Sequence, residues 1–260
     1  MELREWAELI LSADNLADKL LEPGILTDNF PGSSIFWKEP SRPSNMQFKS
    51  HTRRDKLPKL KDLSKPDNRA ACLHRFAGHE LLAVEIMAYA LLAFPDTPKH
   101  FRKGLANTLR EEQEHVRLYI QQLNELGMAF GDLPLYKHFW AYTPYMRTPQ
   151  EYIGAMSLTF EMANLDFAPL YGAAFFENGD FKSAELMKRI LKDEIAHVSF
   201  GWNWLKKLKD PGLSQWDAWV ASLPSNLPPT RSMGPVFQRE HRINAGVTED
   251  WLVNFERKLS

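Results

Sequence analysis

Apolar residues recur with a helical period along the chain from about residue 66 to residue 210. A period of about 3.6 residues places the apolar side chains of each segment on one stripe, which is typical of helices packed around a core. No strand pattern occurs anywhere in the sequence. The pattern predicts four long helices, which span residues 68–94, 98–127, 148–178 and 180–209.

Residues at the helix ends support this division. A turn with two prolines at residues 94–98 ends the first helix and starts the second, and Gly127 is a natural C-cap for the second. Thr148 can cap the third helix, with Pro149 at its first position, and Glu151 completes a capping box. The predicted boundaries therefore rest on local chemistry as well as on periodicity.

The connections between the helices indicate a topology. Only a few residues join the first helix to the second and the third to the fourth, whereas residues 128–147 separate the two pairs. Two helical hairpins joined by one long crossover are typical of ferritin-like folds. The predicted fold class is therefore all-α, a ferritin-like four-helix bundle with an N-terminal arm and short C-terminal helices.

The flanking regions are expected to cover this bundle. Residues 1–65 begin with one amphipathic segment, from Leu3 to Leu21, and continue as an extended arm rich in proline and lysine. Residues 66–210 form the bundle, and residues 211–260 form a C-terminal extension, so the chain is predicted to be a single domain. Short helices are expected in the extension at residues 215–222, 238–245 and 248–259.

Two Glu-x-x-His pairs are the first candidates for chemistry. Glu112 and His115 lie on the second helix, and Glu194 and His197 lie on the fourth. Residues three apart on a helix share one face, so each pair can bind one metal ion. Two such pairs alone are weak evidence, because chance also produces this spacing.

Two further glutamates repeat the arrangement. Glu80 lies midway along the first helix and Glu161 midway along the third, each before one of the pairs and among apolar residues. Burying an ionised carboxylate without compensation costs several kcal/mol, so four of them in one core require cations. Two divalent ions would balance four carboxylates. A Glu from each of two helices and a Glu-x-x-His from each of the others is the ligand set of di-iron and di-manganese carboxylate proteins.

Several stretches of the chain resemble a known family. They are RPS and KLPKL in the arm, LHRFAGHELLAVEIMA, LREEQEHVRLYIQQLNELG followed by GDLP, the region of Glu161, LKDEIAHVSFGWNW and GPVFQREHRINAG. These stretches resemble bacterial ferritin-like proteins grouped as a domain of unknown function, which are distantly similar to the tRNA-modifying di-iron hydroxylase. The resemblance implies a di-metal bundle whose ligands are Glu80, Glu112, His115, Glu161, Glu194 and His197.

Other polar residues near these positions have two readings each. Glu111 and Asp193 lie four residues before a ligand histidine and could accept its distal N–H, which would fix the imidazole tautomer, or they could be exposed helix acids. His74, Tyr89 and Tyr119 could face a substrate pocket, although aromatic residues in a bundle usually belong to the core.

The ligand set favours an enzyme that uses O₂. The leading hypothesis is a non-haem di-metal oxidoreductase with two Fe ions, or Fe/Mn or Mn/Mn, which hydroxylates or oxidises a small-molecule or RNA-borne substrate. An external electron donor is expected, because the sequence has no G-x-G-x-x-G fingerprint for a flavin or nicotinamide. The alternatives are a ferroxidase or other iron-handling protein, and a metal-free helical scaffold.

The charge balance of the sequence restricts the classes of partner that the protein is expected to bind. The chain has 32 Lys and Arg against 33 Asp and Glu, which gives no global electrostatic case for polyanions or membranes. Residues 49–65 carry seven basic residues and two Asp, but a short basic run is usually a solvated surface. The single cysteine, Cys72, excludes an intramolecular disulfide, and no secretory signal is apparent. We expect a cytoplasmic monomer or homodimer.

Overall fold

A computed structural model of the chain describes residues 1–50 and 56–259, and the regular secondary structure of these residues is helical. Outside the helices, two isolated β-bridges pair described residues, Glu2 with Thr27 and Phe48 with Leu135. The all-α prediction is therefore confirmed. The α-helices are α1 (Leu3–Ser12), α2 (Leu16–Lys19), α3 (Pro66–Ala93), α4 (Lys99–Glu125), α5 (Pro149–Ala155), α6 (Met162–Glu177), α7 (Phe181–Leu208), α8 (Gln215–Ser222), α9 (Arg239–Asn244) and α10 (Glu249–Leu259).

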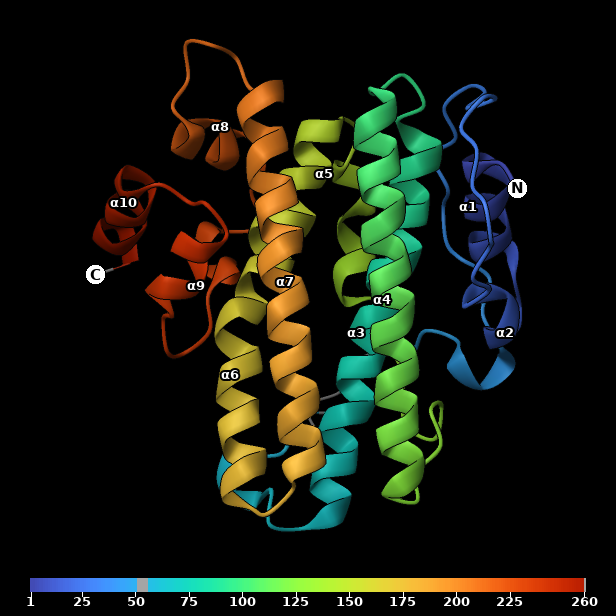
Figure 1. Cartoon of the computed structure of the whole chain (residues 1–260), viewed down its shortest axis with the longest axis vertical. Coiled ribbons are helices and arrows are strands. Elements are labelled where there is room, and N and C mark those ends of the chain that lie inside the picture. The colour runs from blue at the N-terminus through green and yellow to red at the C-terminus, as the bar shows by residue number, and fades with distance from the viewer. Residues whose placement is uncertain (51–55, 260) are drawn as a thin grey trace. The chain divides into compact units, whose positions relative to one another are not determined.

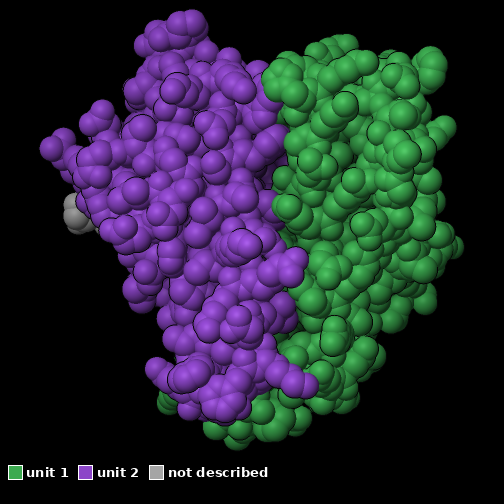
Figure 2. All heavy atoms as spheres, in the orientation of Figure 1, with its two compact units in different colours: residues 1–141 green, residues 142–260 purple. Residues whose placement is uncertain are grey.

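The chain divides into two compact units, residues 1–141 and 142–260 (Figure 2). Each unit is built on one pair of long antiparallel helices, α3 with α4 in the first unit and α6 with α7 in the second (Figure 1). The boundary between the units falls inside the predicted crossover, residues 128–147. The division into an arm, a bundle and a C-terminal extension stays a prediction.

The α3 helix is the core of the first unit. Pro66 occupies its first turn, where a missing backbone N–H costs nothing, and most of its side chains from Ala70 to Ala93 are buried. By length and composition α3 could cross a membrane, but 89% of that window is buried inside the protein. A buried core helix meets the same criteria, so this finding is weak evidence for a membrane span.

The N-terminal segment differs from the prediction. Instead of one amphipathic segment from Leu3 to Leu21, the chain forms α1 and α2 with a break at Ala13, whose backbone is extended. The Asn15 side chain accepts a hydrogen bond from the backbone N–H of Asp18 and so starts α2. The single-segment prediction was wrong because an N-cap asparagine begins a new helix at an angle that periodicity does not encode.

A buried charge cluster ties this N-terminal region to α3. Glu85 accepts from Lys19 Nζ at 3.0 Å and from Arg42 Nη2 at 2.5 Å, and all three side chains are buried. Burial lowers the pKa of the Lys19 ammonium, while the neighbouring Glu85 carboxylate opposes that shift. Glu85 is therefore a buried acid that this chain compensates with its own cations.

The helix starts in the second unit follow the sequence signals closely. Thr148 and Glu151 form the predicted capping box at the start of α5. The next segment, η4 (Met156–Glu161), is π-helical, and the Thr159 hydroxyl donates to the Gly154 carbonyl five residues earlier at 2.7 Å. Single π-helical turns of this kind are frequent at functional sites.

The C-terminal extension forms the three predicted helices α8, α9 and α10. Trp216, Trp219, Trp251 and Phe255 from α8 and α10 pack ring against ring, with centroid separations of 4.9 to 6.2 Å. This aromatic cluster also packs on the rest of the unit, because the Trp251 ring lies 6.0 Å from the Trp202 ring of α7 and Trp219 Nε1 donates to the Gly154 carbonyl of α5 at 3.2 Å. In the basic arm at residues 49–65, positions 51–55, which include Arg53 and Arg54, lie outside the described residues.

Candidate metal centre

The first unit gathers three of the predicted ligands. Glu80 comes from α3, and Glu112 and His115 come from neighbouring positions on α4. One ligand atom from each residue lies within 4.8 Å of the others, and all three side chains are buried. His115 Nδ1 lies 3.3 Å from Glu112 Oε2. This group could hold a metal ion.

The hairpin geometry explains why these three side chains meet. Residues three apart on a helix share a face, so Glu112 and His115 point in one direction from α4. Antiparallel packing of α3 on α4 places the middle of one helix beside the middle of the other, and Glu80 lies near the middle of α3. A local spacing and one helix pairing are therefore enough to assemble the group.

The second unit holds the corresponding residues. Glu161 ends the π-helical segment η4, and Glu194 and His197 lie one turn apart on α7. A carboxylate oxygen of Glu161 lies within 4.8 Å of a ring nitrogen of His197, and His197 Nδ1 lies 3.7 Å from Glu194 Oε2. All three side chains are buried.

The electrostatics of these groups differ from those of Glu85. The groups that the geometry places next to Glu80 are another buried carboxylate and an imidazole, whereas Glu85 lies against a lysine and an arginine. Two neighbouring carboxylates repel each other and lose hydration on burial, and a divalent cation between them removes both costs. Carboxylate oxygen and imidazole nitrogen suit Fe, Mn or Zn, so the donor set fits a metal ion.

The acids proposed to orient the histidines lie nearer the surface. Asp193 Oδ2 accepts from Arg189 Nε at 2.9 Å, and Glu111 is exposed on α4. Neither observation tests whether these carboxylates also receive an imidazole N–H, so that role stays a prediction. The Asp193 contact does show that its carboxylate takes part in an ion pair one turn from the predicted ligands.

Sequence reasoning missed two features beside the second group. Asn164 Nδ2 donates to Glu194 Oε1 at 2.7 Å, which fixes that carboxylate from α6. Asn164 follows Glu161 by one helical turn, so a polar residue on the ligand stripe was the available signal. The π-helical segment had no comparable signal, because its extra residue per turn depends on packing against α7 and on the Thr159 hydrogen bond.

The three predicted pocket residues are buried in the first unit. The Tyr89 ring packs edge-on against the rings of Phe94 and Trp140, and the Tyr119 ring packs against Phe76 at 6.0 Å. His74 Nε2 accepts from the backbone N–H of Gly131 at 2.9 Å. The two tyrosines therefore pack in the core, and His74 holds the loop at Gly131 through a hydrogen bond. The role of the three residues in a substrate pocket stays a prediction.

His74 should make the stability of the protein depend on pH. Burial, with a smaller contribution from the Arg75 charge, lowers the pKa of His74 from 6.5 to about 4. Between these values the unfolded chain binds the proton and the folded chain does not, so stability falls as the pH drops from 6.5 towards 4. The loss should reach at most about 3 kcal/mol. Urea unfolding at pH 7, 5.5 and 4.5 measures it.

A matched pair of variants isolates this contribution. His74→Gln keeps a side-chain acceptor for the Gly131 N–H but cannot titrate, so the fall in stability between pH 7 and 4.5 should shrink. Asn107→Gln, at an exposed position on α4 where no group titrates, should leave the pH dependence as it is. An unchanged pH dependence in His74→Gln would contradict the assignment.

Comparison with known proteins places nearly the whole chain in one family. A family model matches residues 7–253. The chain belongs to DUF455, a family described as proteins of unknown function. An uncharacterized protein from Haemophilus influenzae is 28% identical over 204 residues, covering 73% of this chain and 69% of that protein. No solved structure matches the chain significantly. The DUF455 match includes all six predicted ligands.

Proposed function

We propose that this DUF455 protein is a non-haem di-metal carboxylate oxidoreductase that uses O₂ to hydroxylate or oxidise an organic substrate. The observation that carries the proposal is the group formed by Glu80, Glu112 and His115, whose ligand atoms lie within 4.8 Å of one another in a buried site. The proposed ions are two Fe, or Fe/Mn or Mn/Mn. In this proposal the chain has a ferritin-like four-helix bundle fold, and each of the two groups holds one of the two ions.

The charges of the two groups support two ions. Each group has two carboxylates and one imidazole, so one divalent ion per group would give a near-neutral cluster that an apolar surrounding tolerates. Two iron or manganese ions held by carboxylates can reduce O₂. Insertion of one oxygen atom into a C–H bond and reduction of the other to water needs two electrons and two protons; we propose an external donor for the electrons and solvent water as the source of the protons.

In this proposal the residues of the chain hold the metal ions and orient the side chains that bind them. The Asn164 amide fixes Glu194 in one orientation, and the buried positions of His115 and His197 keep both imidazoles away from water. A neutral imidazole is the form that binds metal. We propose that the protein acts as a cytoplasmic monomer or homodimer, and that no membrane takes part.

Metal analysis tests this proposal first. Protein purified from cells supplied with iron and manganese should contain about two transition-metal ions per chain, the number of ions in this class of carboxylate protein. Glu112→Ala and Glu161→Ala should each contain less metal than the parent, because each removes a ligand from one group. Metal content is measured by mass spectrometry of the purified proteins.

A control variant makes the result specific. Glu114→Ala removes a half-buried acid on the same helix that pairs with Arg117 at 3.3 Å, and it should keep its metal. No stoichiometric metal in the parent protein, or full retention in both ligand variants, would refute the di-metal proposal. A cage on a sizing column, with rapid ferrous oxidation and no organic substrate, would instead favour iron handling.

A further inference from the structure

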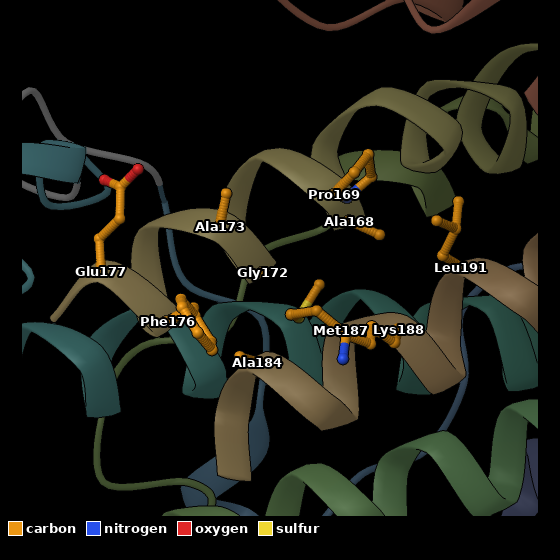
Figure 3. A pocket seen from close by; sticks show the side chains of 10 residues that line it. All are labelled: Ala168, Pro169, Gly172, Ala173, Phe176, Glu177, Ala184, Met187, Lys188 and Leu191. Atoms are coloured by element: carbon orange, nitrogen blue, oxygen red, sulfur yellow. The ribbon is translucent and has the colours of Figure 1, made fainter. Parts of the chain in front are cut away.

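A groove lies on the second unit between α6 and α7 (Figure 3). It has a volume of about 370 Å³ and is lined mainly by apolar side chains. Ligand sites in proteins commonly have volumes of roughly 300–1,000 Å³ and apolar walls with a few polar groups. The groove is therefore large enough for a small organic molecule.

Small residues create the groove. Ala168 and Gly172 from α6 face Ala184 and Met187 from α7. A Cβ atom built on Gly172 would meet Met187 Cβ at 3.2 Å, so the absence of a side chain lets the helices approach closely here. Beside that close contact the short alanines leave space. In Figure 3 the lining residues extend along the helices, from Phe176 at one end to Leu191 at the other.

The floor of the groove leads towards the predicted ligands of the same unit. Ala168 follows Glu161 by two helical turns, and Met187 precedes Glu194 by two turns, so each floor residue shares a stripe with a ligand. Leu191 lies one turn before Glu194, about 4.5 Å along the helix axis. Measured along the axis of α7, one end of a molecule lying in the groove would therefore be about one helical turn from the predicted metal ligand Glu194.

The polar groups of the groove define the ligand further. Lys188 is one of two charged residues in the lining, and its side chain is 71% exposed. Its 2.9 Å ion pair with Glu185 is a surface pair, which contributes little and can exchange for another anion. Glu177, the other charged residue, lies beside Phe176 at the far end of the groove in Figure 3. The groove thus offers one cation partway along an apolar trough.

We infer that this groove binds a linear hydrocarbon chain that carries a single anionic group, as in a medium-chain fatty acid. The hydrocarbon covers the apolar walls between Phe176 and Leu191, and the carboxylate pairs with Lys188. A ligand with several negative charges does not match the one cation of the lining. That this ligand is the substrate of the metal centre rests on the proposed function; that the groove binds it does not.

Calorimetric titration of the full-length protein with dodecanoate tests this inference. The parent protein should bind about one molecule per chain, and binding should weaken at least tenfold in Ala184→Leu, because the larger side chain fills the groove. Lys188→Met should weaken dodecanoate several-fold and leave 1-dodecanol unaffected, since the alcohol has no charge to pair. The matched controls Ala221→Leu and Lys206→Met, both at exposed positions outside the groove, should bind as the parent does.

A second variant and a folding check guard against loss of binding that is caused by misfolding. Ala184 is buried, so Ala173→Leu serves as a second filling variant at an exposed lining position, and thermal unfolding checks that both variants fold. Undiminished dodecanoate binding in folded Ala184→Leu and Ala173→Leu, or no saturable binding by the parent, would overturn the inference. Metal content measured on the same samples reports on the proposed function separately, because none of these substitutions touches a predicted ligand.

Discussion

Asp166→Ala is expected to destabilise the protein by about 3 kcal/mol or more, because it leaves a buried guanidinium without its carboxylate. Asp166 on α6 accepts from Arg242 Nη1 at 2.7 Å and from Arg242 Nη2 at 2.9 Å, and both side chains are fully buried. The same carboxylate also accepts from the backbone N–H groups of Gly234 and Gln238, at 2.9 and 2.7 Å. Chemical denaturation measures the loss.

The second residue of the pair provides the control. Asp166→Ala combined with Arg242→Met removes both charges, so the double variant should be more stable than Asp166→Ala alone. The backbone N–H groups of Gly234 and Gln238 still lose their acceptor, so stability should not return fully. If the losses in free energy of unfolding from the two substitutions are simply additive, the buried ion pair does not stabilise the contact between the C-terminal segment and α6.

Glu112→Leu is expected to separate stability from metal binding. Leucine has a similar volume and no charge, so it removes the repulsion and desolvation of a buried carboxylate next to Glu80. The metal-free variant should therefore unfold at a free energy equal to or above that of the metal-free parent. Adding ferrous or manganous ion should stabilise the parent by about 3 kcal/mol per site at a concentration a hundredfold above the dissociation constant, and should stabilise the variant less, because the variant has lost one of the two sites.

Thermal unfolding with and without added metal measures both effects. Glu114→Leu is the matched control, since it replaces a half-buried acid on the same helix and should keep the full response to metal. A large loss of stability in metal-free Glu112→Leu would mean that the carboxylate holds the fold together, and would argue against a metal as its partner. The metal response of Glu80→Leu should follow that of Glu112→Leu, because both residues belong to one group.

The sequence was sufficient for the local structure of this protein. The long helices, the capping box of Thr148 and Glu151 and the three C-terminal helices all follow from signals within a few residues of each element. The joint placement of Glu112 and His115 on one face of α4 follows in the same way. These features depend on helical periodicity and on hydrogen bonds between near neighbours, which the order of residues determines directly.

The break between α1 and α2 and the π-helical turn before Glu161 were not predictable in this way. Both depend on a balance between an intact α-helix and a competing side-chain hydrogen bond, from Asn15 in one case and Thr159 in the other. Such hydrogen bonds compete with the helix at many serine, threonine and asparagine positions, and packing decides which of them prevail.

Only the tertiary structure distinguished the buried acids from one another. Glu80 and Glu85 lie close together on α3, and both stand among apolar residues in the sequence. The fold places Glu85 against Lys19 and Arg42, and it places Glu80 against Glu112 and His115. A sequence predicts that an acid will be buried, because burial follows the helix stripe. It does not predict the compensating charge, because that partner arrives from a distant segment whose position depends on how the whole chain packs.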